Sequence, residues 1–399
     1  MAEATPDGVW RLPLIRAFAS SRFRIVLASL ATAFGLFAHA LDRSLVAPKL
    51  HGVAPDFGAY YAAAERTLAG VSPYLPTQLS EPVDAVCSGC YLYPPFLAQI
   101  LAPLTVLPPA TASVLWWVSQ VMMALTAVWL ATGLGGARRS LERFLWCLVA
   151  VLWFAPLYDA LRLGNVTATV ALGATLVACG GAATGAGAAI ATLIKVVPAT
   201  LVPAAVFAGR AALLTFVGTA ATILAISTVL APQAWLDYGR VLPNMLAGSV
   251  DYSWNFAPAN MVSQAAFGEH VRVAVRLGAL TLAVAAVFVS VFLVRRRGGA
   301  PAAAFLGVLA MLLLPGTLWF HYYGALLPFA AIVWPTARRL VRVGLVASAT
   351  AMTPYLFEPL PGVIGALVMV VIIGWSLARA ARGLDTRSTS LARTVAVRA

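Results

Sequence analysis

The stretch 110–133 reads ATASVLWWVSQVMMALTAVWLATG and contains no charged residue. A helix needs about 20 apolar residues to cross the hydrocarbon core of a bilayer, so this stretch predicts a membrane-spanning helix. Six further stretches have a similar composition, at residues 24–41, 143–161, 211–231, 273–294, 303–320 and 360–378. Their Ala, Leu and Val runs do not alternate with polar residues, which excludes barrel strands. We therefore expect an all-α polytopic membrane protein.

The composition of the whole chain supports this prediction. Of 399 residues, 61% are apolar and 10% are charged, and the mean hydropathy is +0.88. A soluble domain carries about 25% charged residues. A chain this apolar cannot bury its surface in a water-soluble core, so lipid must be part of its solvent.

The net charge of +13 indicates membrane topology rather than a nucleic-acid partner. Basic residues gather in short segments between the apolar stretches, and Lys and Arg accumulate on the cytoplasmic side of membranes. The arginines concerned are Arg11, Arg16, Arg22, Arg24, Arg138, Arg139, Arg143, Arg295, Arg296, Arg297, Arg338, Arg339, Arg342, Arg379 and Arg382. We therefore predict that both termini are cytoplasmic and that the chemistry is extracytoplasmic.

This topology divides the chain into three parts. Residues 1–23 form a cytoplasmic N-terminus that runs into a retained first span without a cleavage site. Residues 24–381 form a single membrane domain with long outer loops at 42–93 and 232–271. Residues 382–399 form a basic cytoplasmic tail, which we expect to be disordered.

Three apolar segments are ambiguous. Residues 94–107 are too short for a full crossing and predict a re-entrant or interfacial piece. Residues 165–180 are equally unclear. The segment 186–209 contains Lys195 and Pro198, so we expect it to be broken. Broken helices at membrane depth usually line a cavity.

The candidate catalytic residue is Asp56, in the first outer loop. It follows Pro55 and precedes an amphipathic stretch from Phe57 to Ala69, which places it in the N-cap position of a predicted helix. It could serve only as that cap. The same loop contains Cys87 and Cys90, which form either a local disulfide or two free thiols.

Three cationic or proton-carrying residues are expected on the same side as Asp56, namely Arg162, Lys195 and His321. Charged groups near membrane depth are costly and tend to be functional. A carboxylate can take a proton from a hydroxyl, and cations can stabilise an anionic leaving group such as phosphate. Each cation also has a simpler interpretation: Lys195 can snorkel, Arg162 can anchor at the interface, and His321 can be a hydrogen-bonded turn residue.

Several short motifs occur in order along the chain and resemble glycosyltransferase family 87. They are DFGAYYAAA at residues 56–64, GVSPY at 70–74, YLYPPF at 91–96, LGN at 163–165, IKVVP at 194–198, NFAPAN at 255–260 and HYY at 321–323. The resemblance covers roughly residues 25–340. The IKVVP motif departs from the family pattern by two residues inserted between Lys and Pro.

The resemblance implies a C-type glycosyltransferase fold with about 10–12 transmembrane or re-entrant helices and an amphipathic helix in the first outer loop. It implies an inverting enzyme of the bacterial plasma membrane that moves a sugar, by default mannose, from a polyprenyl-phosphate donor to a cell-envelope glycolipid or glycan. The acidic residue of the first outer loop acts as the base in such enzymes, and here that residue is Asp56.

The remaining site residues follow from the same resemblance. Lys195, Arg162 and His321 are assigned to the donor phosphate. A second group is assigned to the sugar or the acceptor: Tyr60, Tyr61, Tyr93, Asn255 and Tyr322. Some relatives carry a second acid near the first, which this loop lacks, so we predict neither a metal nor a cofactor.

Two other classes of function compete with the transferase. A transporter or flippase for a lipid-linked sugar would show inverted repeats and polar residues near the membrane midplane. The sequence shows no repeat, and the charged candidates gather on the outer side. A non-catalytic scaffold in envelope assembly would lack a donor-sized cavity beside Asp56.

Overall fold

The computed structural model describes residues 20–46, 53–84, 87, 89–248, 255–264, 267–353 and 359–396. Every regular element within these ranges is a helix, as the sequence predicts. In chain order they are α2 (Ser21–Val46), α3 (Pro55–Leu68), α4 (Pro76–Ser80), α5 (Pro95–Leu101), η2 (Ala102–Val106), α6 (Pro109–Leu134), α7 (Leu141–Trp153), α8 (Ala155–Leu163), α9 (Thr167–Cys179), α10 (Ala182–Ile194), η3 (Val197–Leu201), α11 (Val202–Phe207), α12 (Arg210–Leu230), α13 (Pro232–Ala247), α14 (Pro258–Gln264), α15 (Glu269–Val294), α16 (Ala300–Leu313), η4 (Phe320–Leu326), α17 (Leu327–Val333), η5 (Trp334–Thr336), α18 (Arg339–Ala351) and α19 (Pro359–Ala396). Part of the predicted cytoplasmic N-terminus, residues 1–19, lies outside the described ranges.

Within the described ranges, five helices are long and apolar enough to cross a membrane: α2, α6, α12, α15 and α19. They confirm the predicted spans at those positions and make the chain a polytopic membrane protein. The stretch 143–161, expected as one span, is instead two helices, α7 and α8, bent by 69°. Pro156 explains the break, because it has no amide hydrogen to donate to the carbonyl of Leu152 four residues earlier, and its ring would clash with that carbonyl in a continuous helix.

The stretch 303–320 also differs from the expected single span. Helix α16 covers 14 residues and ends at Leu313. Pro315 follows two residues later and cannot continue the helix. At the C-terminus the opposite happens: α19 continues as helix to Ala396, where we expected a disordered tail.

The two short apolar segments behave as their sequences predict. Residues 95–106 form α5 and η2, a piece too short to cross a bilayer. The segment 186–209 is broken at Lys195, where the chain is extended between α10 and η3. The break removes intrahelical hydrogen bonds and turns the lysine side chain toward other elements.

Small residues let the central helices approach closely. Helices α9 and α10 pack against each other, and α10 also packs on α12. A Cβ added to Gly173 would lie 2.8 Å from the Gly187 carbonyl oxygen, so the two backbones meet there. Small residues at helix interfaces allow such packing where lipid provides no hydrophobic drive for association.

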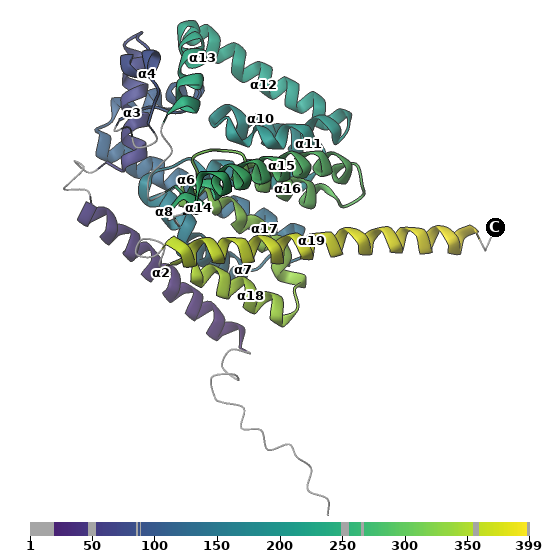
Figure 1. Ribbon diagram of the computed structural model, residues 1–399. Coiled ribbons are helices and arrows are strands. Elements are labelled where there is room, and N and C mark those ends of the chain that lie inside the picture. The colour runs from purple at the N-terminus through teal and green to yellow at the C-terminus, as the bar shows by residue number, and fades with distance from the viewer. Residues whose placement is uncertain are drawn as a thin grey trace, which may run out of the picture.

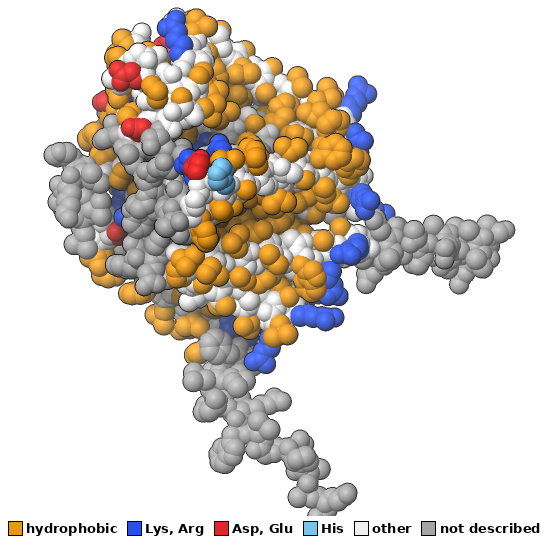
Figure 2. Space-filling model, in the orientation of Figure 1, with side chains coloured by type: hydrophobic (Ala, Val, Ile, Leu, Met, Phe, Trp, Pro, Cys, Tyr) orange, Lys and Arg blue, Asp and Glu red, His pale blue; other side chains and the backbone are white. Residues whose placement is uncertain are grey.

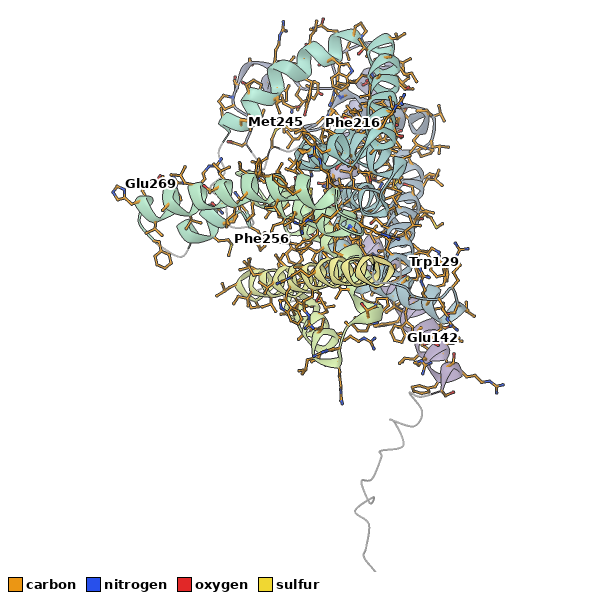
Figure 3. The ribbon with its side chains drawn as sticks, turned by 90° about the vertical axis from the view of Figure 1, so that its right-hand side faces the viewer. Trp129, Glu142, Phe216, Met245, Phe256 and Glu269 are labelled. Atoms are coloured by element: carbon orange, nitrogen blue, oxygen red, sulfur yellow. A yellow bond between two sulfur atoms is a disulfide. The ribbon has the colours of Figure 1, made fainter. Side chains whose placement is uncertain are left out.

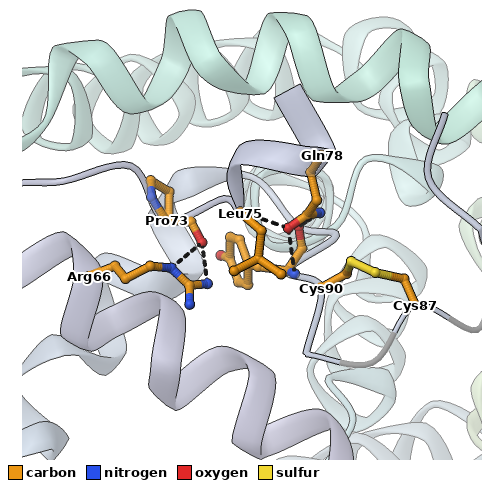
Figure 4. Close-up of a disulfide and its surroundings, with 7 residues drawn as sticks. Arg66, Pro73, Leu75, Gln78, Cys87 and Cys90 are labelled. Carbon is orange, nitrogen blue, oxygen red and sulfur yellow. Dashed lines mark hydrogen bonds between the residues drawn. A yellow bond between two sulfur atoms is a disulfide. The ribbon is translucent and has the colours of Figure 1, made fainter. Parts of the chain in front are cut away.

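Residues 53–84 and 89–93 of the predicted outer loop form a cap at one end of the bundle, where α3, α4 and α13 gather (Figure 1). Gln78 fixes the returning chain: its amide nitrogen donates to the Tyr91 carbonyl, and its amide oxygen accepts from the backbone of Leu75 and Tyr91. A disulfide joins Cys87 and Cys90 beside these contacts (Figure 4), which decides between the two alternatives left by the sequence.

Charge is distributed unevenly between the two ends of the bundle. Lys and Arg side chains line the end opposite the cap, at the right-hand edge in Figure 2, and most visible Asp and Glu side chains lie toward the cap. Helix α15 shows the same polarity along one element: it starts at Glu269 and ends just before Arg295. Glu269 lies far from Trp129 and Glu142 (Figure 3).

Candidate active site

Asp56 lies in the first turn of α3, one residue after the helix begins at Pro55. The N-cap residue is Ala54, so the expected N-cap position for Asp56 is wrong by two residues. Proline is favoured at the first helical position, which sets the start of the helix. A carboxylate in the first turn is stabilised by the helix dipole, and its direction is fixed by a rigid element.

Asn165 holds the Asp56 side chain. Its amide nitrogen donates to Oδ2 of Asp56 at 2.6 Å and to the Tyr93 hydroxyl at 3.1 Å. Its amide oxygen accepts from the backbone and the hydroxyl of Thr167, at 3.1 and 2.9 Å. Both ends of the buried Asn165 amide are therefore hydrogen-bonded. Oδ1 of Asp56 makes no hydrogen bond within the described part of the chain.

Gly164 makes this contact possible. Its φ is +74°, and a Cβ there would lie 2.8 Å from Cβ of Phe57 and 3.1 Å from Cβ of Ala54. Glycine alone combines the left-handed conformation with so close an approach to α3. The Trp116 indole donates to the Gly164 carbonyl at 2.7 Å and clamps the turn from the other side.

The side chains of Tyr60 and Tyr93 form a tyrosine wall beside Asp56. The rings of Tyr60 and Tyr93 lie edge to face, with centroids 4.8 Å apart. The Tyr74 hydroxyl donates to the Tyr93 carbonyl at 2.9 Å and so ties this wall to the cap. Burial raises the pKa of the Tyr60 and Tyr93 hydroxyls well above the ordinary value, and the Asp56 carboxylate raises the pKa further. Both therefore remain neutral hydroxyls that can donate or accept hydrogen bonds.

Lys195 faces the same wall from the break between α10 and η3. Its Nζ lies 3.7 Å from the ring centroid of Tyr322 and 5.2 Å from that of Tyr93. Among the described residues no carboxylate lies within 4 Å of this ammonium group. A narrow pocket opens beside it, lined by Thr167, Val170, Lys195, Val197, Met311, Tyr322 and Ala325. An ammonium group held by aromatic faces suits an anionic ligand.

Arg162 and His321 belong to a neighbouring cluster around Asp159, a residue that the sequence analysis did not single out. Arg162 contacts one carboxylate oxygen of Asp159 at 3.1 Å, and His321 Nδ1 lies 3.5 Å from the other. Asp159 is 4% exposed. The sequence signal for Asp159 is its position three residues before Arg162 inside an apolar segment, because buried acids are rare in such segments.

Two predicted residues make other contacts. The Tyr61 hydroxyl donates to the carbonyl of Leu107 at 2.8 Å and that of Thr105 at 3.2 Å. Asn255 donates to the Gly316 carbonyl and accepts from the backbone of Ala257 and Leu318. The structure therefore groups Tyr60, Tyr93, Lys195 and Tyr322 with Asp56 through shared contacts, and it places Tyr61 and Asn255 in contacts that fix the backbone.

No group of three or more His, Cys, Asp and Glu side chains lies together in the part of the chain that the structure describes. Metal independence stays a prediction, which rests on the chemistry of the residues present. The positive charge beside Asp56 comes from Lys195.

Comparison with other proteins places this chain in a family. Neither the curated proteins nor the solved structures gave a match. The model of glycosyltransferase family 87 matches residues 91–315, more than half of the chain. The matched segment contains Tyr93, Asn165 and Lys195, whereas Asp56 and Tyr322 lie outside it. The match covers more than half of an all-helical membrane chain in which a carboxylate and a cation face the same tyrosine side chains. It shows that the chain belongs to glycosyltransferase family 87.

Proposed function

We propose that this glycosyltransferase moves a sugar from a polyprenyl-phosphate donor to a hydroxyl of a cell-envelope glycolipid or glycan. One observation carries the proposal: Asp56, fixed by Asn165, and Lys195, without a carboxylate partner in the described ranges, face the same tyrosine wall. A base and a cation on one wall are what a displacement at the sugar C1 requires. Membership of the family favours this function over the transporter and the scaffold.

In the proposed step, Asp56 removes the proton from the acceptor hydroxyl. The oxygen attacks C1 from the face opposite the phosphate, and the bond from C1 to the phosphate oxygen breaks. The electron pair leaves with the phosphate, so the anomeric configuration inverts. Asn165 engages Oδ2 of Asp56 and leaves Oδ1 for the proton.

Lys195 acts on the leaving group in this proposal. Negative charge builds on the bridging phosphate oxygen as the bond breaks, and a nearby ammonium group lowers the energy of that transition state. The hydroxyls of Tyr60, Tyr93 and Tyr322 are candidates for contacts with the sugar. Mannose is the proposed sugar, because it is frequent in the family that the chain resembles.

The charge of Lys195 is therefore expected to be essential. Lys195→Met should lower kcat/KM for the donor by about 100- to 1,000-fold, the usual cost of one group that stabilises developing charge. Lys195→Arg keeps the charge and should retain more activity than Lys195→Met. Initial rates of sugar transfer by the purified variants at varied donor concentration provide the measurement. Equal rates for Lys195→Met and wild type would remove Lys195 from the mechanism.

The proposed site lies on the extracytoplasmic face of a bacterial plasma membrane, with both termini cytoplasmic. The concentration of Lys and Arg at the end opposite the cap supports this orientation (Figure 2). Helix α15 has 26 residues, and at about 1.5 Å per residue it is long enough to cross the bilayer.

Cysteine labelling in intact cells tests this orientation. A cysteine replacing Glu269 should react with a membrane-impermeant maleimide, and one replacing Arg297 should react only after lysis. Both positions are exposed, at opposite ends of α15. A Cys179→Ala background removes the exposed native thiol, and Cys147 is buried. The reverse pattern of labelling would invert the topology.

A further inference from the structure

The carboxylate of Asp159 lies between two groups that can carry positive charge. Oδ1 contacts the Arg162 guanidinium at 3.1 Å, and Oδ2 lies 3.5 Å from His321 Nδ1. Asp159 and Arg162 are one turn apart on α8, and His321 comes from η4, which packs along α8. The carboxylate therefore connects the two elements across their interface.

Neither ring nitrogen of His321 makes a hydrogen bond among the described residues, although Nδ1 lies 3.5 Å from Asp159. His321 is 2% exposed, and within the described part of the chain Nε2 makes no hydrogen bond. The imidazole lies between the Trp319 ring, stacked at 6.3 Å, and the Tyr322 ring at 5.1 Å. A buried polar atom without a partner costs about 1–3 kcal/mol, so such an atom needs an explanation, and a ligand supplies one.

The cluster lies beside the residues that contact Asp56 and Lys195. Tyr322, the residue after His321, holds the Lys195 ammonium group against its ring. Asp159 lies on the helix that leads through Gly164 into Asn165, the residue that holds Asp56. These two segments of chain thus contact the proposed base through Asn165 and Lys195 through Tyr322, and they themselves carry Arg162 and His321.

We propose that Asp159 is a positioning residue for the donor phosphate: it orients Arg162 and holds His321 as an imidazolium whose Nε2–H donates to a phosphate oxygen. The inference rests on the proposed function. An imidazole with Nδ1 beside a carboxylate carries its first proton there. A second proton on Nε2 then makes that nitrogen a hydrogen-bond donor. Without that second proton Nε2 is an acceptor, which repels phosphate oxygens.

The groups facing this pair come from three elements. Asp159, Arg162 and Tyr158 belong to α8, and Tyr322 belongs to η4. The Asp42 carboxylate of α2 interacts electrostatically with both Asp159 and Arg162. Helices α9, α16 and α17, which also pack on η4, contain no charged residue. Asp159 is therefore the carboxylate in direct contact with His321 among the described residues.

The test compares Asp159→Asn with wild type in a sugar-transfer assay at varied donor and acceptor concentrations. We expect the donor KM to rise about 10- to 100-fold, the value of a hydrogen bond to a charged group, with the acceptor KM unchanged. A merely structural role of Asp159 would change both KM values or neither. An unchanged donor KM in a folded variant would overturn the proposal.

Asp237→Asn is the matched control. Asp237 is also 4% exposed and also contacts an arginine three residues later, but it lies in α13 with no histidine beside it. The same substitution there should leave the donor KM unchanged. An equal rise of the donor KM in both variants would mean that loss of a buried charge alone matters, and would contradict the proposal.

A second variant keeps the proposal testable if Asp159→Asn does not fold. His321→Gln should also raise the donor KM, and adding Asp159→Asn to it should raise the donor KM by a smaller factor than Asp159→Asn does in wild type. An unchanged donor KM in His321→Gln, or fully additive effects in the double variant, would contradict the proposal. Failure of wild-type protein to use any polyprenyl-phosphate sugar would instead contradict the proposed function itself.

Discussion

Asp56→Asn is expected to lower kcat by about 100- to 10,000-fold, the usual contribution of general acid–base catalysis. The amide is the same size as the carboxylate and cannot take a proton from the acceptor hydroxyl. Asp56 is half-buried at a helix N-terminus, and Asn is tolerated there, so the protein should fold. The measurement is the transfer rate at saturating donor and acceptor.

Glu65→Gln is the control for this substitution. Glu65 is exposed on the same helix, two turns or more from Asp56, and loses the same charge when it becomes Gln. Its transfer rate should stay within about two-fold of wild type. A folded Asp56→Asn enzyme with wild-type kcat would exclude Asp56 as the base.

Gly164→Ala is the second substitution with a large expected effect. The methyl group would lie 2.8 Å from Cβ of Phe57, in a backbone conformation that only glycine adopts without strain. The left-handed conformation and the overpacking together should lower the free energy of unfolding by about 2–5 kcal/mol. The variant should unfold at a lower temperature in detergent, and any folded fraction should be about 100-fold slower, because Asn165 moves relative to Asp56.

Gly70→Ala separates the cost of a side chain in the left-handed conformation from the cost of the close approach to α3. Gly70 has a similar φ of +71°, but a Cβ there would have no atom within 4 Å. Its cost should be limited to the strain of about 1–2 kcal/mol, with activity retained. Equal loss of activity in both variants would show that the approach of Gly164 to α3 is not what positions the site.

Much of the fold could be predicted because the bilayer imposes a simple rule on length and composition. The spans at α2, α6, α12, α15 and α19 are long apolar runs with few charges, and the broken segment at Lys195 contains its own signals, a lysine and a proline. The amphipathic helix α3 follows from its periodicity.

Three departures from the sequence prediction share one cause, the local effect of proline on the backbone. Pro156 splits the stretch 143–161, Pro315 follows the early end of α16, and Pro55 starts α3 one residue before Asp56. Hydropathy averages over about 19 residues, so a single proline hardly changes it. The apolar character of these segments was predictable, and their division into helices was not.

The sequence predicted which residues to consider for the candidate site, but not which of them lie close together in space. Asp56, Tyr60, Tyr93, Lys195 and Tyr322 are brought together, and this needs the turn at Gly164 that places Asn165 among them. Asp159 was missed because it lies in a stretch with the composition of a membrane span. Its contact with His321 joins residues 162 positions apart, and no local pattern reports such a contact.

Consumption of sugar donors by the purified protein tests the central proposal most directly. The wild-type enzyme and Asp56→Asn are each given a panel of polyprenyl-phosphate sugars and a panel of nucleotide sugars, with a glycolipid acceptor extract. The proposal predicts that wild type releases polyprenyl phosphate and glycosylated acceptor in equal amounts, and that Asp56→Asn releases neither. Use of a nucleotide sugar alone, or movement of a lipid-linked sugar across a vesicle membrane without transfer, would contradict it.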